Sequence, residues 1–187
     1  MESFNLRQAL KEFVPFDENE AECLRKTLNF VETGSNLFSR SNQLGHINSS
    51  AFLMNSDLSK LLMMHHKFLN QWFQFGGHSD GDENTMRVAA REVREESGIE
   101  NFVPLRNGVF DISVNSIPCN EKKKEPAHLH FDIYFIFTTD TEKFQVSSES
   151  NSLRWFTLDE YKKLEPTEQR RRFAGKWEQL RKKNSSA

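Results

Sequence analysis

Apolar residues near the start of the chain recur at the spacing of an α-helix. One apolar stripe runs from Leu6 to Phe13 and stops ahead of a proline, which cannot continue a helix interior. Asp17, followed three residues later by Glu20, resembles a capping box, and Gly34 ends the second apolar stripe that begins there. Each helix has a single apolar face. We therefore predict that both helices pack against the rest of the chain.

The periodicity changes to that of β-strands from His46 onward. Apolar and polar residues alternate most regularly between Leu129 and Phe137, as they do on a strand whose side chains point to opposite faces in turn. Helices before, among and after the strands predict an α/β fold. We expect strands over residues 47–54, 60–66, 71–75, 109–117, 127–139 and 153–156, a capped helix from Thr157 to about Leu164, and a further helix within 165–187.

A group of charged residues and glycines at fixed spacing interrupts this series of strands. The helix that carries them is expected from Glu83 to Ser97, with Asp82 as its N-cap and Gly98 as a left-handed C-cap residue. The fixed residues are Gly77, Glu83, Arg91, Glu92, Glu95, Glu96 and Gly98.

Three carboxylates of this group lie on one edge of the predicted helix. Glu92, Glu95 and Glu96 are spaced i, i+3, i+4, next to a buried stripe that runs from Met86 to Val93. Like charges at this spacing cost about 0.2 to 0.5 kcal/mol per pair, so something must offset their repulsion. Clustered carboxylate oxygens suit Mg²⁺ or Mn²⁺. The pattern therefore predicts a divalent metal site.

The segment from Gly77 to Ile99 resembles the Nudix box in every specified position. The resemblance implies an α/β/α sandwich with a mixed β-sheet, in which the box forms a loop, a helix and a second loop. It extends loosely over residues 46–164, which we expect to be the Nudix hydrolase domain. Residues 1–45 would then be a helical N-terminal extension, and residues 165–187 a C-terminal helix and tail.

The resemblance also implies roles for the box residues. Glu92, Glu95 and Glu96 match the glutamates of the family that bind metal and act in catalysis, and the backbone carbonyl of Gly77 matches an additional ligand. Glu83 and Arg91 resemble supporting residues that form an ion pair. Direct contact of this pair with the substrate is the alternative.

Two positions in the chain are candidates for the general base. Members of the family take it either from a glutamate of the box or from a carboxylate in a distant loop. Glu149 precedes the strand at 153–156, where the family commonly places such a glutamate, and it is our candidate outside the box. A role as an ordinary exposed loop residue is the alternative.

Histidines supply a second set of candidate residues, for substrate binding. His128, His130 and Asp132 alternate along one strand and so project from the same face. Three interpretations are open for this row: it lines a substrate cleft, it is the polar side of the sheet, or it forms a second metal site, which is the least favoured because carboxylates already supply one. His78 follows two glycines, where it would meet a phosphate or stay solvated.

Composition narrows the function classes further. The net charge of −2 provides no basic field for nucleic acid, and no apolar run approaches the roughly 20 residues of a spanning helix, so we expect neither nucleic-acid nor membrane binding. The start of the chain lacks the features of a secretion signal. Cys23 and Cys119 show no metal-site spacing, which favours reduced thiols and a cytoplasmic location.

These observations predict a metal-dependent pyrophosphohydrolase that cleaves a diphosphate linkage in a nucleoside diphosphate derivative or a related small molecule. A non-catalytic nucleotide sensor on the same fold is one alternative. A diphosphate isomerase is another; it would need a cysteine as proton donor, and the sequence does not place Cys119 in the cleft. A scaffold role for the N-terminal helices and a homodimer are also open. The sequence does not specify the substrate.

Overall fold

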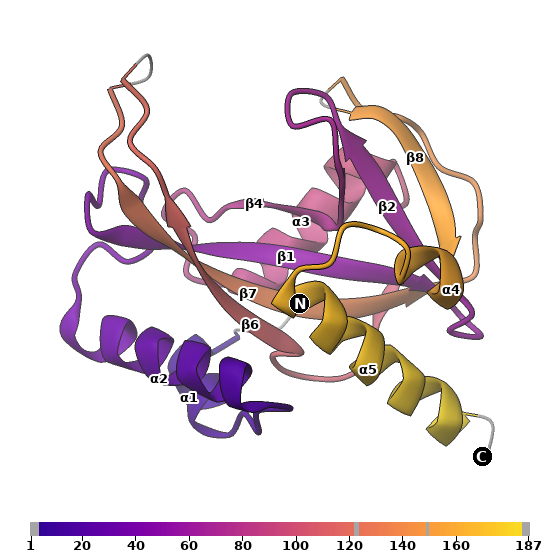
Figure 1. The fold of residues 1–187 in the computed structure, drawn as a ribbon, viewed down its shortest axis with the longest axis horizontal. Helices are drawn as coiled ribbons and strands as arrows, with labels where there is room; N and C mark the ends of the chain where they lie inside the picture. Colours follow the sequence, from indigo (N-terminus) through magenta and orange to yellow (C-terminus); the bar gives the residue numbers. More distant parts are fainter. Residues whose placement is uncertain (1–3, 122–123, 149, 185–187) are drawn as a thin grey trace. The chain divides into compact units, whose positions relative to one another are not determined.

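A computed structural model describes residues 4–121, 124–148 and 150–184 (Figure 1). The chain divides into two units. The first contains the chain up to Ser50 with Gly76–Ala89 and Gly108–Phe135. The second contains Ala51–Phe75, Ala90–Asn107 and the chain from Ile136 onward.

The two N-terminal helices belong to the first unit. They are α1 (Leu6–Lys11) and α2 (Glu18–Thr33). Asp17 caps α2 as predicted, because its side chain accepts the Glu20 N–H at 2.8 Å. Glu20 is fully buried, and its carboxylate accepts the Phe16 N–H at 2.7 Å and the Ile112 N–H at 3.3 Å. The carboxylate therefore connects the start of α2 to a strand.

Four strands contribute to the first unit: β1 (Gly45–Asn55), β4 (Phe75–His78), β6 (Asp111–Ile117) and β7 (His128–Thr139). β6 pairs antiparallel with β7, from Asp111 opposite Tyr134 to Ile117 opposite His128, and β4 pairs with β1. Figure 1 shows α2 running along the β6–β7 pair, and Phe30 of α2 stacks on Phe131 of β7 with ring centres 4.1 Å apart. The predicted apolar face of α2 thus covers this part of the sheet.

The second unit is built around β2 (Lys60–His66), which pairs antiparallel along its length with β8 (Ser150–Thr157) (Figure 1). The short strands β3 (Trp72–Phe73) and β5 (Val103–Pro104) pair with β2 and β7. Helix α4 (Leu158–Tyr161) begins with the predicted capping box of Thr157 and Glu160. Helix α5 (Glu168–Asn184) packs through Phe173, which stacks on Phe52 with ring centres 3.8 Å apart.

Five of the six predicted strands are present, whereas the one predicted over 71–75 is divided between β3 and β4, and the helix predicted from Thr157 to about Leu164 ends at Tyr161. Gly76 and Gly77, interpreted from the sequence as a loop, lie within β4. A Cβ atom at Gly76 would lie 2.9 Å from the Ser50 Cα atom, so only glycine lets β4 approach β1 this closely. The α/β fold class is confirmed, with a mixed sheet and helices before, among and after the strands. In the part of the chain that the structure describes, no helix is long and apolar enough to cross a membrane.

Candidate functional site

Helix α3 (Thr85–Ser97) carries the charged residues of the motif and begins two residues later than predicted. The N-cap prediction for Asp82 was wrong. The Asn84 side chain accepts the Arg87 N–H at 3.0 Å, as an N-cap does, whereas Asp82 accepts the Asn84 N–H at 2.9 Å in a two-residue turn. Asp82 also forms an ion pair of 2.6 Å with Arg87. The side chain of either residue could cap the helix, and Asn84 does so because the turn at Asp82 delays the start of the helix.

The C-terminal end of α3 follows the prediction. Gly98 has φ of 67°, and its N–H donates to the Arg94 carbonyl oxygen at 2.8 Å. A Cβ atom at Gly98 would lie 3.0 Å from the Gln145 Cβ atom, so the left-handed backbone and the close neighbour both favour glycine. The Gln145 N–H donates to the Ser97 carbonyl oxygen at 2.8 Å. The end of the helix is therefore anchored to a distant loop.

The three carboxylates of α3 differ in exposure. The predicted apolar stripe is buried, including Met86 and Val93. Beside it, Glu96 is 5% exposed, the Glu92 side chain is 12% exposed and the Glu95 side chain is 62% exposed. Two of the three carboxylates are thus largely withdrawn from water, where an unneutralised negative charge is costly.

Arg91 lies between two of these carboxylates. Its Nη2 atom donates to Glu92 Oε1 at 2.7 Å, and its Nε atom lies 3.8 Å from Glu95 Oε2. The guanidinium therefore offsets part of the repulsion along this edge and fixes the direction of the Glu92 side chain. Glu83 is exposed just before α3. Its predicted ion pair with Arg91 stays a prediction.

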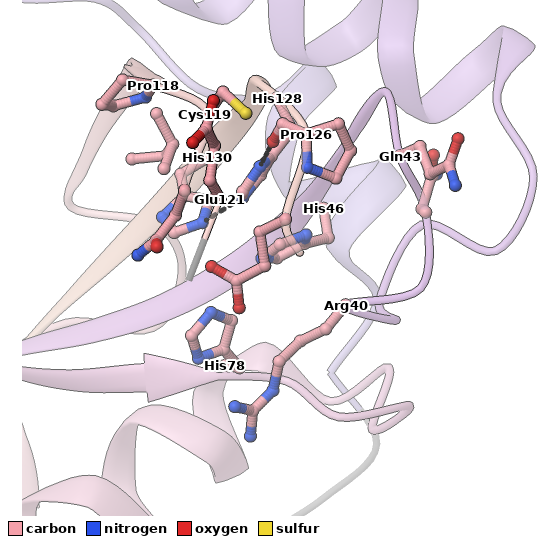
Figure 2. Close-up of a pocket in the computed structure, with 14 residues that line it drawn as sticks. Arg40, Gln43, His46, His78, Pro118, Cys119, Glu121, Pro126, His128 and His130 are labelled. Carbon is pink, nitrogen blue, oxygen red and sulfur yellow. Dashed lines mark hydrogen bonds between the residues drawn. The ribbon is translucent and has the colours of Figure 1, made fainter. Parts of the chain in front are cut away.

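The first unit contains a cluster of histidines. His46 near the start of β1, His78 at the end of β4 and His130 in β7 each offer a ring nitrogen, and these atoms lie within 4.8 Å of one another. Among the residues that the structure describes, the three potential metal-binding side chains that lie this close together are histidines. They are not glutamates of the box. Figure 2 shows these rings at the wall of one pocket, together with His128.

Burial determines the charge of this cluster. Burial, together with the nearby imidazoles of His78 and His128, lowers the pKa of His46 to about 4. Burial also lowers the pKa of His130 to about 3, with the same kind of contribution from its histidine neighbours. The pKa of His78 is lowered by burial first and by the charge of Arg40 second. These three imidazoles are therefore neutral near pH 7.

The predicted polar row on β7 divides between two environments. The ring nitrogens Nε2 of His128 and His130 lie 3.0 Å apart, which places both residues on one face. Asp132 instead accepts hydrogen bonds from the amide nitrogens of Asn48 at 3.1 Å and Asn115 at 2.6 Å. Burial raises the pKa of Asp132, and these two amides oppose that shift. Asp132 thus connects three strands, next to the histidines but outside their cluster.

The pocket beside the cluster has a volume of about 660 Å³. Arg40, Glu121 and Glu125 line it with polar groups, and Cys119 also lines it with an exposed thiol. The Arg40 guanidinium pairs with Asp80 through two hydrogen bonds of 2.6 Å. The pocket therefore holds side chains of both charge signs within a largely apolar lining.

Glu149 lies outside the described residues, so its candidacy as general base stays a prediction. His46 was not identified from the sequence as a site residue. The signal was present, because His46, Asn48 and Ser50 alternate with apolar or small residues on β1. A polar face on a strand that is buried along most of its length points to a site.

Comparison with known protein families gives one match over most of the chain: residues 45–176 match the model of the NUDIX domain. A Lactococcus lactis subsp. cremoris protein described as a probable DHNTP pyrophosphohydrolase is 25% identical over 144 residues, which cover 76% of this chain and 83% of that protein. The asymmetrical bis(5'-nucleosyl)-tetraphosphatase of Rattus norvegicus is 28% identical over 106 residues, covering 57% of this chain and 69% of that protein.

The fold is similar to that of solved structures. The E. coli dihydroneopterin triphosphate pyrophosphohydrolase superimposes with a TM-score of 0.54 at 15% identity, over 69% of this chain and 92% of that chain. At this identity the likeness establishes the fold and no more.

Proposed function

This chain belongs to the NUDIX domain family, and from that premise we propose that it cleaves a diphosphate linkage in a nucleoside diphosphate derivative or a related small molecule. The protein is a hydrolase that acts on phosphoanhydride bonds. The observation that carries the proposal is the match of residues 45–176 to the family, with each fixed residue of the box in place between Gly77 and Gly98.

The family generally uses a divalent metal, and the residues at the box helix fit one. Glu92 and Glu96 lie one turn apart, and both are largely withdrawn from water, where clustered carboxylates need a cation. We assign the binding of Mg²⁺ or Mn²⁺ to Glu92, Glu95, Glu96 and the Gly77 carbonyl. When bound, such an ion neutralises phosphate oxygens and favours deprotonation of water.

The side chains around this site have separate tasks in the proposal. Arg91 is a positioning residue, because its hydrogen bond to Glu92 holds that carboxylate in one direction. Proton removal from the attacking water falls to a glutamate of the box or to Glu149. The substrate contacts proposed for His78, His128 and His130 are supported by their position at the wall of one pocket.

A panel of diphosphate compounds tests the activity. The panel includes dihydroneopterin triphosphate and a dinucleoside tetraphosphate, because relatives are named for such compounds. We expect hydrolysis of at least one compound with Mg²⁺ or Mn²⁺. Glu95→Gln and Glu96→Gln should each lower kcat by about 100-fold or more, since each removes a carboxylate charge from the site.

Glu100→Gln is the matched control, because Glu100 follows the box, is exposed and pairs with Arg94 at 3.3 Å. It should hydrolyse the same compound at the wild-type rate. The proposal fails if the wild type cleaves no compound of the panel with either metal, or if the box variants are as active as the control.

The assignment of the general base has its own test. If Glu149 removes the proton, Glu149→Gln should lower kcat by about 100-fold with little change in KM and remove the lower limb of the pH–rate profile. The melting temperature should stay unchanged. A fully active variant would assign the base to the box instead.

A homodimer and a cytoplasmic location also belong to this proposal. Both cysteines are free thiols, Cys23 buried and Cys119 exposed, which agrees with a reducing compartment. Sedimentation equilibrium measures the oligomeric state directly.

A further inference from the structure

The closest gathering of ligand side chains in the described chain includes His46, to which the proposed hydrolysis gives no role, together with His78 and His130. The ring centres of His46 and His130 lie 4.6 Å apart, those of His46 and His78 lie 5.1 Å apart, and those of His78 and His130 lie 5.4 Å apart. Three imidazoles bound to one tetrahedral ion, with nitrogens about 2.0 to 2.1 Å from it, place their ring centres about 5 Å apart. The observed distances between ring centres therefore match those of three histidines that bind one metal ion.

The environment of His46 is the strongest indication that these three histidines bind a cation. It is 3% exposed, and neither its Nδ1 nor its Nε2 atom has a hydrogen-bond partner. A buried polar group without a partner costs about 1 to 3 kcal/mol, and such groups are rare in folded proteins. A cation bound to one ring nitrogen would give the lone pair of that nitrogen a partner inside the protein.

The protonation states of the neighbouring rings suit metal binding. The His128 Nδ1 atom lies 2.8 Å from the Pro126 carbonyl oxygen, which can only accept, so this nitrogen carries the hydrogen. One hydrogen lies between His128 Nε2 and His130 Nε2, which are 3.0 Å apart, so the His130 nitrogen outside this contact is Nδ1. A hydrogen bond from a ring N–H to a backbone carbonyl oxygen, which fixes the tautomer of a histidine, is common beside metal ligands.

The charges around the cluster also favour a cation. The carboxylates of Glu121 and Glu125 line the same pocket. Arg40 also lines the pocket, but its guanidinium pairs with Asp80 through two hydrogen bonds. A divalent ion would therefore meet imidazole ligands with carboxylates close by.

We propose that His46, His78 and His130 together bind one divalent transition-metal ion of the zinc class, with its remaining coordination position open to the 660 Å³ pocket. Imidazole nitrogen selects zinc, cobalt, nickel and copper over magnesium, which prefers oxygen. Three protein ligands and one open position are typical of zinc sites that bind a further molecule. This site uses none of the glutamates assigned to hydrolysis.

Titration of the untagged full-length protein with Co²⁺ tests the proposal. We expect one equivalent to bind at pH 7 with the visible absorption of four-coordinate Co²⁺, and Zn²⁺ to displace it. His46→Gln and His130→Gln should each weaken binding by at least about 100-fold, since even loss of a residue that only supports a ligand costs 10- to 100-fold. His78→Asn is a third variant, at a half-buried position, in case a buried substitution impairs folding.

His65→Gln is the matched control, because His65 lies outside the cluster and bonds to the Asn151 side chain at 3.1 Å. His65→Gln and Cys119→Ser should each bind Co²⁺ as the wild type does. The double variant with Glu95→Gln and Glu96→Gln should lose hydrolysis and still bind Co²⁺, which separates this site from the proposed function. Absence of saturable binding, or wild-type binding in the folded His46 and His130 variants, would overturn the proposal.

Discussion

At the scale of single residues, the environment of a side chain decides how far its pKa departs from the ordinary value, even among side chains of the same type. The chain has six histidines. His46 and His130 lie in the cluster, where burial and neighbouring imidazoles lower the pKa of each. Asp132, two residues beyond His130, bonds to two asparagines and has its pKa raised by burial. Side-chain type alone predicts none of these differences, because each depends on what lies across the sheet.

These histidines should make the metal-free protein sensitive to acid. In the folded state His46 has a pKa of about 4, whereas in the unfolded chain it has its ordinary value of 6.5. The unfolded state therefore binds more protons between these values, so stability is complete above pH 6.5, falls as the pH drops toward 4 and then levels off. His46 alone should contribute a loss on the order of 3 kcal/mol.

Urea unfolding in the presence of a chelator, at pH values from 7 to 4, measures this loss. His130 acts in the same direction. His46→Gln should flatten the pH dependence relative to the wild type, and His65→Gln should leave it unchanged. An identical slope for the wild type and His46→Gln between pH 6.5 and 4 would contradict the prediction.

At the scale of elements, the box helix is defined by its two ends. Asn84 caps the start of α3, and Gly98 closes its end with a left-handed backbone. The end is also anchored to the Gln145 segment through the Ser97 carbonyl. The exposed and buried edges of α3 follow from its sequence spacing, whereas the exact start depends on the preceding turn.

Gly98→Ala should destabilise the protein by about 1 to 2 kcal/mol. The added Cβ atom meets the unfavourable left-handed backbone and lies 3.0 Å from the Gln145 Cβ atom. Thermal unfolding measures the effect. Gly81→Ala is the comparison, because Gly81 also has a positive φ, of 90°, but nothing lies within 4 Å of its added Cβ atom. A smaller loss at Gly98 than at Gly81 would show that Gln145 moves aside without cost.

At the scale of the whole molecule, the N-terminal helices are part of the first unit rather than an appendage to it. Residues up to Ser50 belong to the same unit as β6 and the first part of β7. The Glu20 carboxylate accepts the Ile112 N–H, and Phe30 stacks on Phe131. These contacts hold the N-terminal helices against the sheet of the first unit, as their single apolar faces predict.

Phe30→Ala should lower the free energy of unfolding by about 2 kcal/mol, less than the 3 to 5 kcal/mol of a fully buried phenylalanine, because Phe30 is half-buried. Urea unfolding measures the change. Phe68→Ala is the control, since Phe68 is 85% exposed and should cost little. Equal effects of the two substitutions would mean that α2 contributes little to the stability of the sheet.

The sequence by itself determined the family, most of the strands and the face and end of the box helix, because periodicity and fixed spacing are local properties of the chain. Leu129 to Phe137 alternates as a strand must, and Glu92, Glu95 and Glu96 share one helix edge whatever surrounds them. The tertiary structure alone decided that His46, His78 and His130 meet. These residues come from three strands far apart in the sequence, so their proximity depends on strand pairing and on the close approach of β4 that Gly76 permits.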